Sequence, residues 1–153
     1  MKKILIGIIS IAFMACTTKD EGVAQISFSE KAFLGELEWV KNFGGSGEDT
    51  AQAVIVTADG GYAILGFSNS TDGDLIGKTT PVNDYWLLKL DADGNLQWNK
   101  TYGGSKDDRG QSLVQTTDGG FALTGYAMSS DGDGSVNNGF HDNWILKLDA
   151  QGT

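Results

Sequence analysis

The sequence is poor in the residues that build disulfides, zinc sites and catalytic triads. Its 153 residues include one cysteine, one histidine and one proline. A single cysteine excludes an internal disulfide, and one histidine with one cysteine disfavours a zinc site. The histidine, His141, is accompanied by no signalled nucleophile, so a serine–histidine–aspartate triad is not expected. No other catalytic constellation is visible, and we expect a protein that is not an enzyme.

Positive charge is also scarce. Lysine and arginine number 11 against 20 acidic residues, which gives a formal net charge of −9. Phosphate backbones require a clustered positive surface, so nucleic acid is not an expected partner. An acidic surface otherwise suits an ordinary secreted module and does not identify a ligand.

No hydrophobic run is long enough to cross a membrane as a helix. The apolar stretch of residues 4–15 is 12 residues long, follows Lys2 and Lys3, and ends immediately before Cys16. A positive start, a short apolar core and a small residue at the end are typical of a signal peptide. We therefore expect residues 1–15 to be a signal peptide and residues 16–34 to be a flexible tether.

The segment around Cys16 resembles a bacterial lipoprotein signal, although Phe13 stands where leucine is usual. The resemblance implies that the Cys16 thiol carries a diacylglycerol and becomes the new N-terminus, so the membrane is an expected partner. The alternative is an ordinary signal peptide followed by a chance cysteine. The next residues, "TTKDEG", resemble a surface-export signal of Gram-negative lipoproteins, or they are simply a polar tether. The expected location is the outer membrane or cell surface of a Gram-negative bacterium.

Against these absences stands an abundance of glycine, 22 residues, and an internal repeat. "GELEWVKNFGGSGEDTAQ" is repeated as "GNLQWNKTYGGSKDDRGQ", and "VTADGGYAILGF" as "QTTDGGFALTGY". Gly44 and Gly103 stand 59 positions apart, whereas Trp86 and Trp144 stand 58 apart, so one residue is lost in a loop. A repeat of this length indicates a tandem architecture of two units, residues 35–93 and 94–153.

Each unit contains four segments in which apolar and polar residues alternate, as they do in strands. Asp-Gly pairs in "TADGGY", "TTDGGF" and "DADGNL" predict tight hairpin turns. We expect the repeated hairpin to form the centre of a four-stranded sheet that is built twice. The predicted strands are residues 37–43, 51–57, 61–67 and 84–90, with copies at 96–102, 110–116, 120–126 and 142–148.

These features predict an all-β fold of two tandem four-stranded antiparallel blades, as in a β-propeller. Propellers close with about four to eight blades, so two would form an incomplete ring. The pattern "YGGS…DGGF…DGD…DNWILKLDAQG" is similar to propeller repeats of about 60 residues in bacterial surface proteins. The resemblance implies either a fragment of a longer array or a protomer that completes its ring by self-association.

The resemblance leaves two functions open. One is a non-enzymatic cell-surface lipoprotein module, a β-propeller repeat scaffold for protein or glycan binding and a fragment of a longer array. The alternative is an accessory domain of a secreted glycan-degrading hydrolase. No set of residues for an organic cofactor is visible.

Calcium is the one metal that the sequence suggests. The loops "SNSTDGDLIG" and "AMSSDGDGSV" carry paired acids that could bind Ca²⁺ through oxygen ligands. The alternative is that each acid caps the backbone of an Asp-Gly turn. The candidate ligands are Asp72, Asp74, Asp131 and Asp133.

The aromatic residues suggest a further binding surface. The tryptophans recur in both units and are expected to fill the core between sheets, or alternatively to stack on sugars. Tyr85 lies on the opposite face of its strand from Trp86, and its counterpart in the second unit is Asn143. A face that accepts both residues is expected to be exposed, which makes Tyr85 and Asn143 candidate binding residues.

Overall fold

A computed structural model describes residues 36–134 and 136–153, which fold as one unit. The predicted signal peptide, Cys16 and most of the tether lie outside the described residues. Within the described part of the chain there is no helix, and hence none that could cross a membrane. The predicted all-β class is confirmed.

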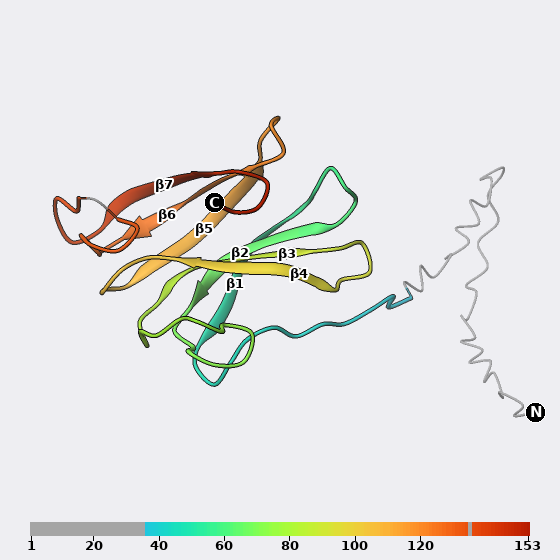
Figure 1. Cartoon of the computed structure of the whole chain (residues 1–153), viewed down its shortest axis with the longest axis horizontal. Helices are drawn as coiled ribbons and strands as arrows, with labels where there is room; N and C mark the ends of the chain where they lie inside the picture. The colour runs from blue at the N-terminus through green and yellow to red at the C-terminus, as the bar shows by residue number, and fades with distance from the viewer. Residues whose placement is uncertain (1–35, 135) are drawn as a thin grey trace, which may run out of the picture. The chain divides into compact units, whose positions relative to one another are not determined.

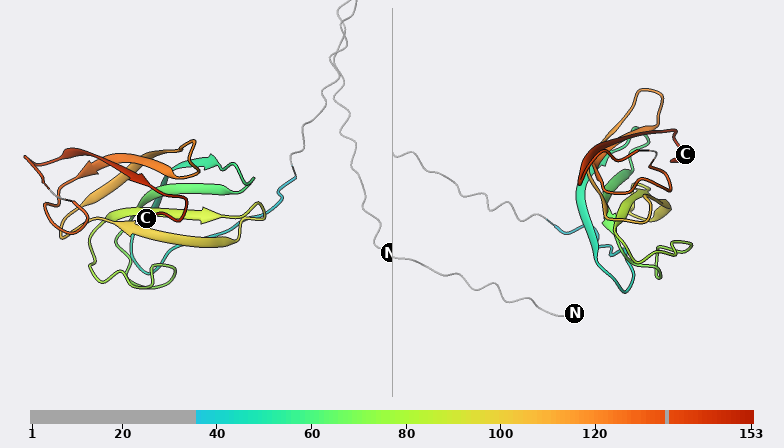
Figure 2. Two further views of the ribbon diagram at one scale, coloured as in Figure 1. Left: turned by 45° about the horizontal axis from the view of Figure 1, so that its top comes forward. Right: turned by 90° about the vertical axis from the view of Figure 1, so that its left-hand side faces the viewer.

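Seven strands form two antiparallel sheets (Figure 1). The first sheet has the order β1-β2-β3-β4 and the second the order β5-β6-β7, and neither closes on itself. Figure 2 shows the two sheets from two further directions. The strands are β1 (Asp49–Val56), β2 (Tyr62–Ser68), β3 (Asp84–Leu90), β4 (Leu96–Tyr102), β5 (Asp108–Gln115), β6 (Phe121–Ala127) and β7 (Asp142–Leu148).

The predicted Asp-Gly turns connect strands in both sheets. Between β1 and β2, Thr57 N donates to Gly61 O at 2.9 Å, and Gly60 adopts a φ of 81°. A positive φ costs glycine nothing because it has no Cβ. The turn between β5 and β6 repeats this geometry, and Gly94 serves the turn between β3 and β4 with a φ of 75°. Local turn chemistry therefore determines where three of the hairpins reverse.

The composition of the first sheet differs from the sequence-based prediction in one strand. Residues 37–43 form no strand, and the segment predicted to open the second repeat is instead β4, the last strand of the first sheet. The tight turn of residues 91–95 returns the chain directly from β3 into β4, so these strands must pair. As a result the repeated hairpin is not central: β1 is an edge strand, and each sheet begins one strand later than its sequence repeat.

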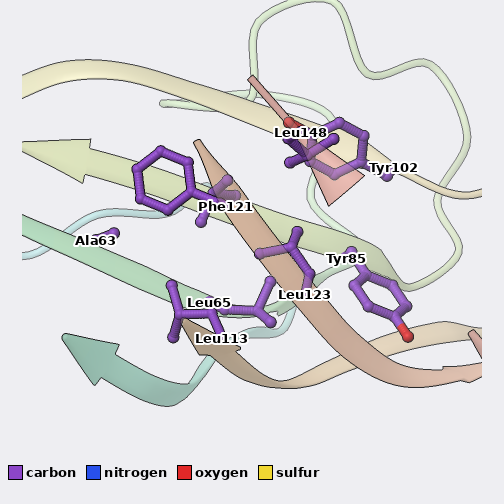
Figure 3. Close-up of a cluster of buried hydrophobic side chains, with 9 residues drawn as sticks. Ala63, Leu65, Tyr85, Tyr102, Leu113, Phe121, Leu123 and Leu148 are labelled. Atoms are coloured by element: carbon purple, nitrogen blue, oxygen red, sulfur yellow. The ribbon is translucent and has the colours of Figure 1, made fainter. Parts of the chain in front are cut away.

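The main core lies between the two sheets (Figure 3). Tyr85 of β3 is fully buried and meets Trp144 of β7 edge-to-face, with ring centroids 5.1 Å apart. Trp98 packs against the same cluster and meets Phe121 edge-to-face. The buried members come from both sheets: Ala63, Leu65, Tyr85, Leu87, Tyr102, Leu113, Phe121, Leu123 and Leu148.

A second, smaller cluster covers the other face of the first sheet. Trp86, Leu88 and Leu90 of β3 are buried there, together with Leu75 from a loop. Phe43 packs against it from the segment that precedes β1. The tryptophans at β3, β4 and β7 thus serve the cores as predicted, whereas Trp39 remains 37% exposed.

Candidate functional site

Three aspartates hold the glycine-rich corner that precedes β1. Asp49 accepts a hydrogen bond from Gly45 N at 2.8 Å, and Asp72 accepts one from Ser46 N at 2.7 Å. Asp74 accepts the N–H of Gly44 at 2.8 Å. Asp49, Asp72 and Asp74 together form what we call the first aspartate clasp.

The second sheet carries the same arrangement, the second aspartate clasp, made by Asp108, Asp131 and Asp133. These carboxylates accept the amide N–H groups of Gly104, Ser105 and Gly103 at 3.0, 2.9 and 3.0 Å. Because both copies use the same residues for the same bonds, the clasps belong to the framework of the fold.

The four aspartates predicted to bind calcium all lie in these clasps. Hydrogen bonds from the backbone N–H groups of Ser46 and Ser105 hold the carboxyl pKa values of Asp72 and Asp131 below their usual range. Among residues 36–134 and 136–153, no group of three or more histidine, cysteine or acidic side chains could hold a metal ion. Each of the four carboxylates accepts a backbone N–H group 26 or 30 residues away, which neither prediction anticipated, and calcium binding stays a prediction.

The clasps lead into two loops that differ completely between the copies. The first loop is residues 75–83, "LIGKTTPVN", and its counterpart, residues 134–141, reads "GSVNNGFH". No aligned position is identical across this stretch. We refer to residues 75–83 and 136–141 as the variable loops.

The first variable loop is held from beneath by a buried lysine. Lys78 Nζ donates to Thr80 O and, at 2.7 Å, to Val82 O. It also forms an ion pair with Asp84 Oδ2 at 3.1 Å, and the two side chains are only 3% and 8% exposed. The loop therefore wraps around a desolvated charge pair.

The second variable loop is held by a different set of contacts. Asn137 occupies the position of Lys78 and donates from Nδ2 to Ala127 O at 2.8 Å. Its Oδ1 accepts the N–H of Gly139 at 2.9 Å, while Asp142 Oδ2 accepts that of Asn138 at 2.5 Å. Both loops are thus fixed by several hydrogen bonds, although their sequences are unrelated.

Each variable loop exposes large apolar side chains. Ile76 of the first loop is 92% exposed, and Val136 and Phe140 of the second are 69% and 73% exposed. Phe140 lies 4.4 Å from the ring of His141, centroid to centroid. Exposed apolar side chains on well-anchored loops are typical of a contact surface.

A polar cluster centred on Asp107 lies beside these loops at the junction of the sheets. Asp107 accepts hydrogen bonds from Tyr126 Oη and Asn83 Nδ2, both at 2.6 Å, and from Arg109 Nε at 3.0 Å. The Arg109 guanidinium also stacks 4.5 Å above the centroid of Phe67. The cluster joins the first variable loop, through Asn83, to the second sheet.

The contacts of this cluster shift the pKa values of Asp107 and Tyr126. Burial raises the pKa of Asp107, but the three hydrogen bonds to its carboxylate outweigh burial and leave the pKa below its usual range. Burial and the bond to Asp107 together raise the pKa of Tyr126 to about 12. These shifts favour an ionised Asp107 and a protonated Tyr126 near neutral pH, which are the states that the Tyr126 Oη to Asp107 hydrogen bond requires.

The two predicted binding residues have different environments. Tyr85 is fully buried, so the expectation that its face is exposed is wrong. The second sheet covers that face, and Tyr85 Oη donates to Trp144 O at 3.4 Å. Asn143 is exposed on β7, where it pairs with Tyr126 in the strand register. Exposed His141 lies 4.3 Å from the Tyr126 ring.

Sequence reasoning did not single out the variable loops. The signal was present in the alignment of the two copies, because residues that both sheets need must recur, whereas residues outside the framework need not. The longest stretch without identity is the loop before the last strand of each repeat. The apolar residues within it, Ile76, Val136 and Phe140, are the ones that a search for unexplained exposure would identify.

The buried carboxyl of Asp84 should make stability depend on pH. Burial raises its pKa from 3.8 to about 6, despite the nearby Lys78 charge. A raised folded-state pKa favours folding when the group is protonated, so this stabilisation is present below pH 3.8 and is lost as the pH rises through about 6. We expect the free energy of unfolding to lose about 2 to 3 kcal/mol across this window.

Urea unfolding at a series of pH values, for the unmodified protein and for Asp84→Asn, would measure this effect. The difference between the two proteins isolates Asp84 from the other acids. Asp59 and Asp118 have lowered pKa values and act in the opposite direction, below pH 3.8. A pH dependence that is the same in both proteins would contradict the assignment.

No protein-family model matches the chain, and no curated protein matches it in sequence.

Proposed function

We propose that the chain is a non-enzymatic cell-surface lipoprotein module, anchored through Cys16, that binds a protein or glycan ligand with its variable loops. The observation that carries the proposal is the contrast between framework and loops. The clasps and Asp-Gly turns recur in both sheets, whereas the loops between the clasps and the last strands share no aligned residue. A constant scaffold that presents divergent loops is a common design of binding proteins.

The proposal includes a blade-like role for each sheet. The second sheet packs Trp144 and Leu123 against the first, and the counterparts of these two residues in the first sheet are Trp86 and Ile64. Successive copies of one sheet that stack through equivalent faces are what a propeller array requires. This equivalence supports the proposal that the two sheets belong to a larger ring of such sheets.

The nature of the exposed residues favours a macromolecular ligand. Ile76 and Val136 are aliphatic, and Phe140 adds an aromatic ring beside His141. A small molecule would need a concave, enclosed site, whereas these side chains project from loops. Side chains of this kind contribute to binding when a partner removes them from water.

The test is binding by loop variants. Ile76→Ser and Phe140→Ser are each expected to weaken binding about tenfold, because each loses the burial of one large apolar side chain. The probes are an array of purified bacterial and plant polysaccharides and, on intact cells, a photo-crosslinker placed at residue 136. Saturable binding to one polysaccharide class would indicate a glycan and favour the accessory role in a glycan-degrading system.

Val56→Ser is the matched control, because Val56 is 70% exposed on β1 and lies outside the loops. It should bind as the unmodified protein does. Thermal unfolding of all three variants should be nearly unchanged, since the altered side chains are exposed. Loop variants that bind as well as the Val56 variant would show that the loops are not the binding surface.

A further inference from the structure

The segment before β1 lies on the first sheet much as β4 lies on the second. Trp39 meets Tyr62 edge-to-face at 5.6 Å and 73°, and Trp98 of β4 meets Phe121 at 6.0 Å and 74°. Each tryptophan also faces a turn glycine: Trp39 packs against Gly94 in the way that Trp98 packs against the glycine near the end of the second repeat. The two segments are therefore equivalent in position as well as in sequence.

A lysine in each segment repeats the equivalence. Lys41 Nζ donates to Asn95 Oδ1 at 3.2 Å, and Lys100 Nζ donates to Thr153 Oγ1 at 3.0 Å. The difference lies in the backbone: β4 pairs with β3 along its length, whereas residues 36–45 pair with no strand in the described part of the chain. Residues 36–45 therefore lie where the fourth strand of a preceding sheet would lie, but the described residues contain no such sheet.

The second sheet has the converse feature. β7 pairs with β6 on one side, and its other edge meets no strand among the described residues. In the first sheet the equivalent edge of β3 is covered by β4. Ile145, near the middle of β7, is 73% exposed, whereas its counterpart Leu87 is fully buried. An uncovered strand edge with apolar side chains readily accepts another strand.

We propose that residues 37–43 of a second copy of this chain form the fourth strand of the second sheet, pairing antiparallel with β7. The donor "LEWVKNF" shares its leucine, tryptophan and lysine with β4, "LQWNKTY". Residues 37–43 stay packed on their own first sheet, as β4 stays packed on the second. The contact is head-to-tail, so it joins copies in series and can close into a ring.

The register follows from the internal pair. Leu87 of β3 lies opposite Lys100 of β4, and both side chains are on the face toward the second sheet. The equivalent pair across two copies is Ile145 with Lys41. Val40 is the adjacent donor residue and points to the opposite face, because successive side chains of a strand alternate. Register and face are thus both specified.

A hollow on the first sheet of the copy that donates residues 37–43 indicates where the second sheet of the accepting copy would lie. It has a volume of about 270 Å³ and is lined by residues that include Gly66 and Trp86. Their counterparts in the second sheet are Gly125 and Trp144, and there the space is filled by the Tyr85 side chain. The residue that replaces Tyr85 in the second sheet is Asn143, so in the assembly this smaller side chain faces the hollow.

Site-directed disulfide formation tests the pairing in the full chain with Cys16→Ser. A mixture of the Lys41→Cys and Ile145→Cys variants should form a disulfide between copies on mild oxidation. The yield should exceed that of Val40→Cys with Ile145→Cys by about tenfold, because a shift of one residue moves the thiol to the other face. Both altered side chains are exposed, and an unchanged thermal midpoint confirms folding.

Two results would overturn the proposal. One is a disulfide of Ile145→Cys with itself in equal yield, which would mean that two β7 edges pair symmetrically. The other is a monomer at every concentration in sedimentation velocity. The disulfide reports the pairing of copies alone, so its absence would leave binding by the variable loops untouched.

A substitution that strengthens the association between copies provides an independent test. Asn143→Tyr restores at β7 the side chain that fills the equivalent space between the two sheets. It should tighten the association of copies about tenfold in sedimentation equilibrium, since an aromatic ring becomes buried in the hollow. An unchanged or weaker association would contradict the proposed docking.

Discussion

Replacing Gly66 with alanine should cost about 4 kcal/mol or more of the free energy of unfolding, enough to unfold much of the protein. Gly66 lies on β2 opposite Ala51, at a point where β1 has a bulge. A Cβ at Gly66 would stand 1.7 Å from the carbonyl oxygen of Thr50. Because the clash is with backbone, the two strands must separate, and the hydrogen bonds between them would be lost.

Gly139→Ala is the matched control for Gly66→Ala. Gly139 lies in the second variable loop, has no positive φ, and a Cβ there would meet no atom within 4 Å. Its free energy of unfolding should change by less than about 0.5 kcal/mol. Urea unfolding of both variants measures the difference. Equal stability of the two variants would show that β1 and β2 can part at the bulge without cost.

The second large effect is expected at the second aspartate clasp. Asp108 is fully buried, and its Oδ1 accepts the N–H groups of Met128 and Ser129 at 2.8 and 3.0 Å. Its Oδ2 accepts the N–H of Gly104 at 3.0 Å. Asp108→Asn turns one acceptor into a donor that faces an amide N–H and removes the charge from the remaining bonds. We expect a loss of about 3 kcal/mol.

Thermal unfolding would show this loss as a midpoint about 10 °C lower. Asp93→Asn makes the same chemical change at an exposed position in the turn between β3 and β4 and should leave the midpoint nearly unchanged. If Asp108→Asn has the same thermal midpoint as the unmodified protein, the clasp does not stabilise the corner. The recurrence of the clasp in both sheets would then need another explanation.

Much of the local structure could be predicted because it depends on residues close together in sequence. The alternation in "DYWLLKL" indicates a strand whatever surrounds it, and the Asp-Gly pairs set the turns through the φ angles that glycine allows. Four of the six clasp aspartates, Asp72, Asp74, Asp131 and Asp133, were also identified, although as metal ligands. Their partners are amide groups more than 20 residues away, and no local pattern shows that a backbone N–H will occupy a carboxylate oxygen.

The elements that cover the two faces of β3 could not be predicted from the sequence. Both of its faces are apolar, with Tyr85 and Leu87 on one side and Trp86 and Leu88 on the other. Such a strand is expected in the interior, but the pattern does not say what covers each face. The polar counterpart Asn143 suggested that one face is exposed. Asn143 lies instead on the face of the second sheet that points away from the first sheet, because the adjacent Trp144 packs on the core between the two sheets.

The amino-acid sequence by itself determined the all-β class, the turns and the existence of two equivalent units, because turn preference and side-chain alternation act within a few residues. Only the tertiary structure decided which strands share a sheet, what covers each face of β3, and that residues 37–43 pair with no strand among the described residues. Those outcomes depend on pairing between distant segments, where many alignments satisfy the same local pattern and only packing selects one.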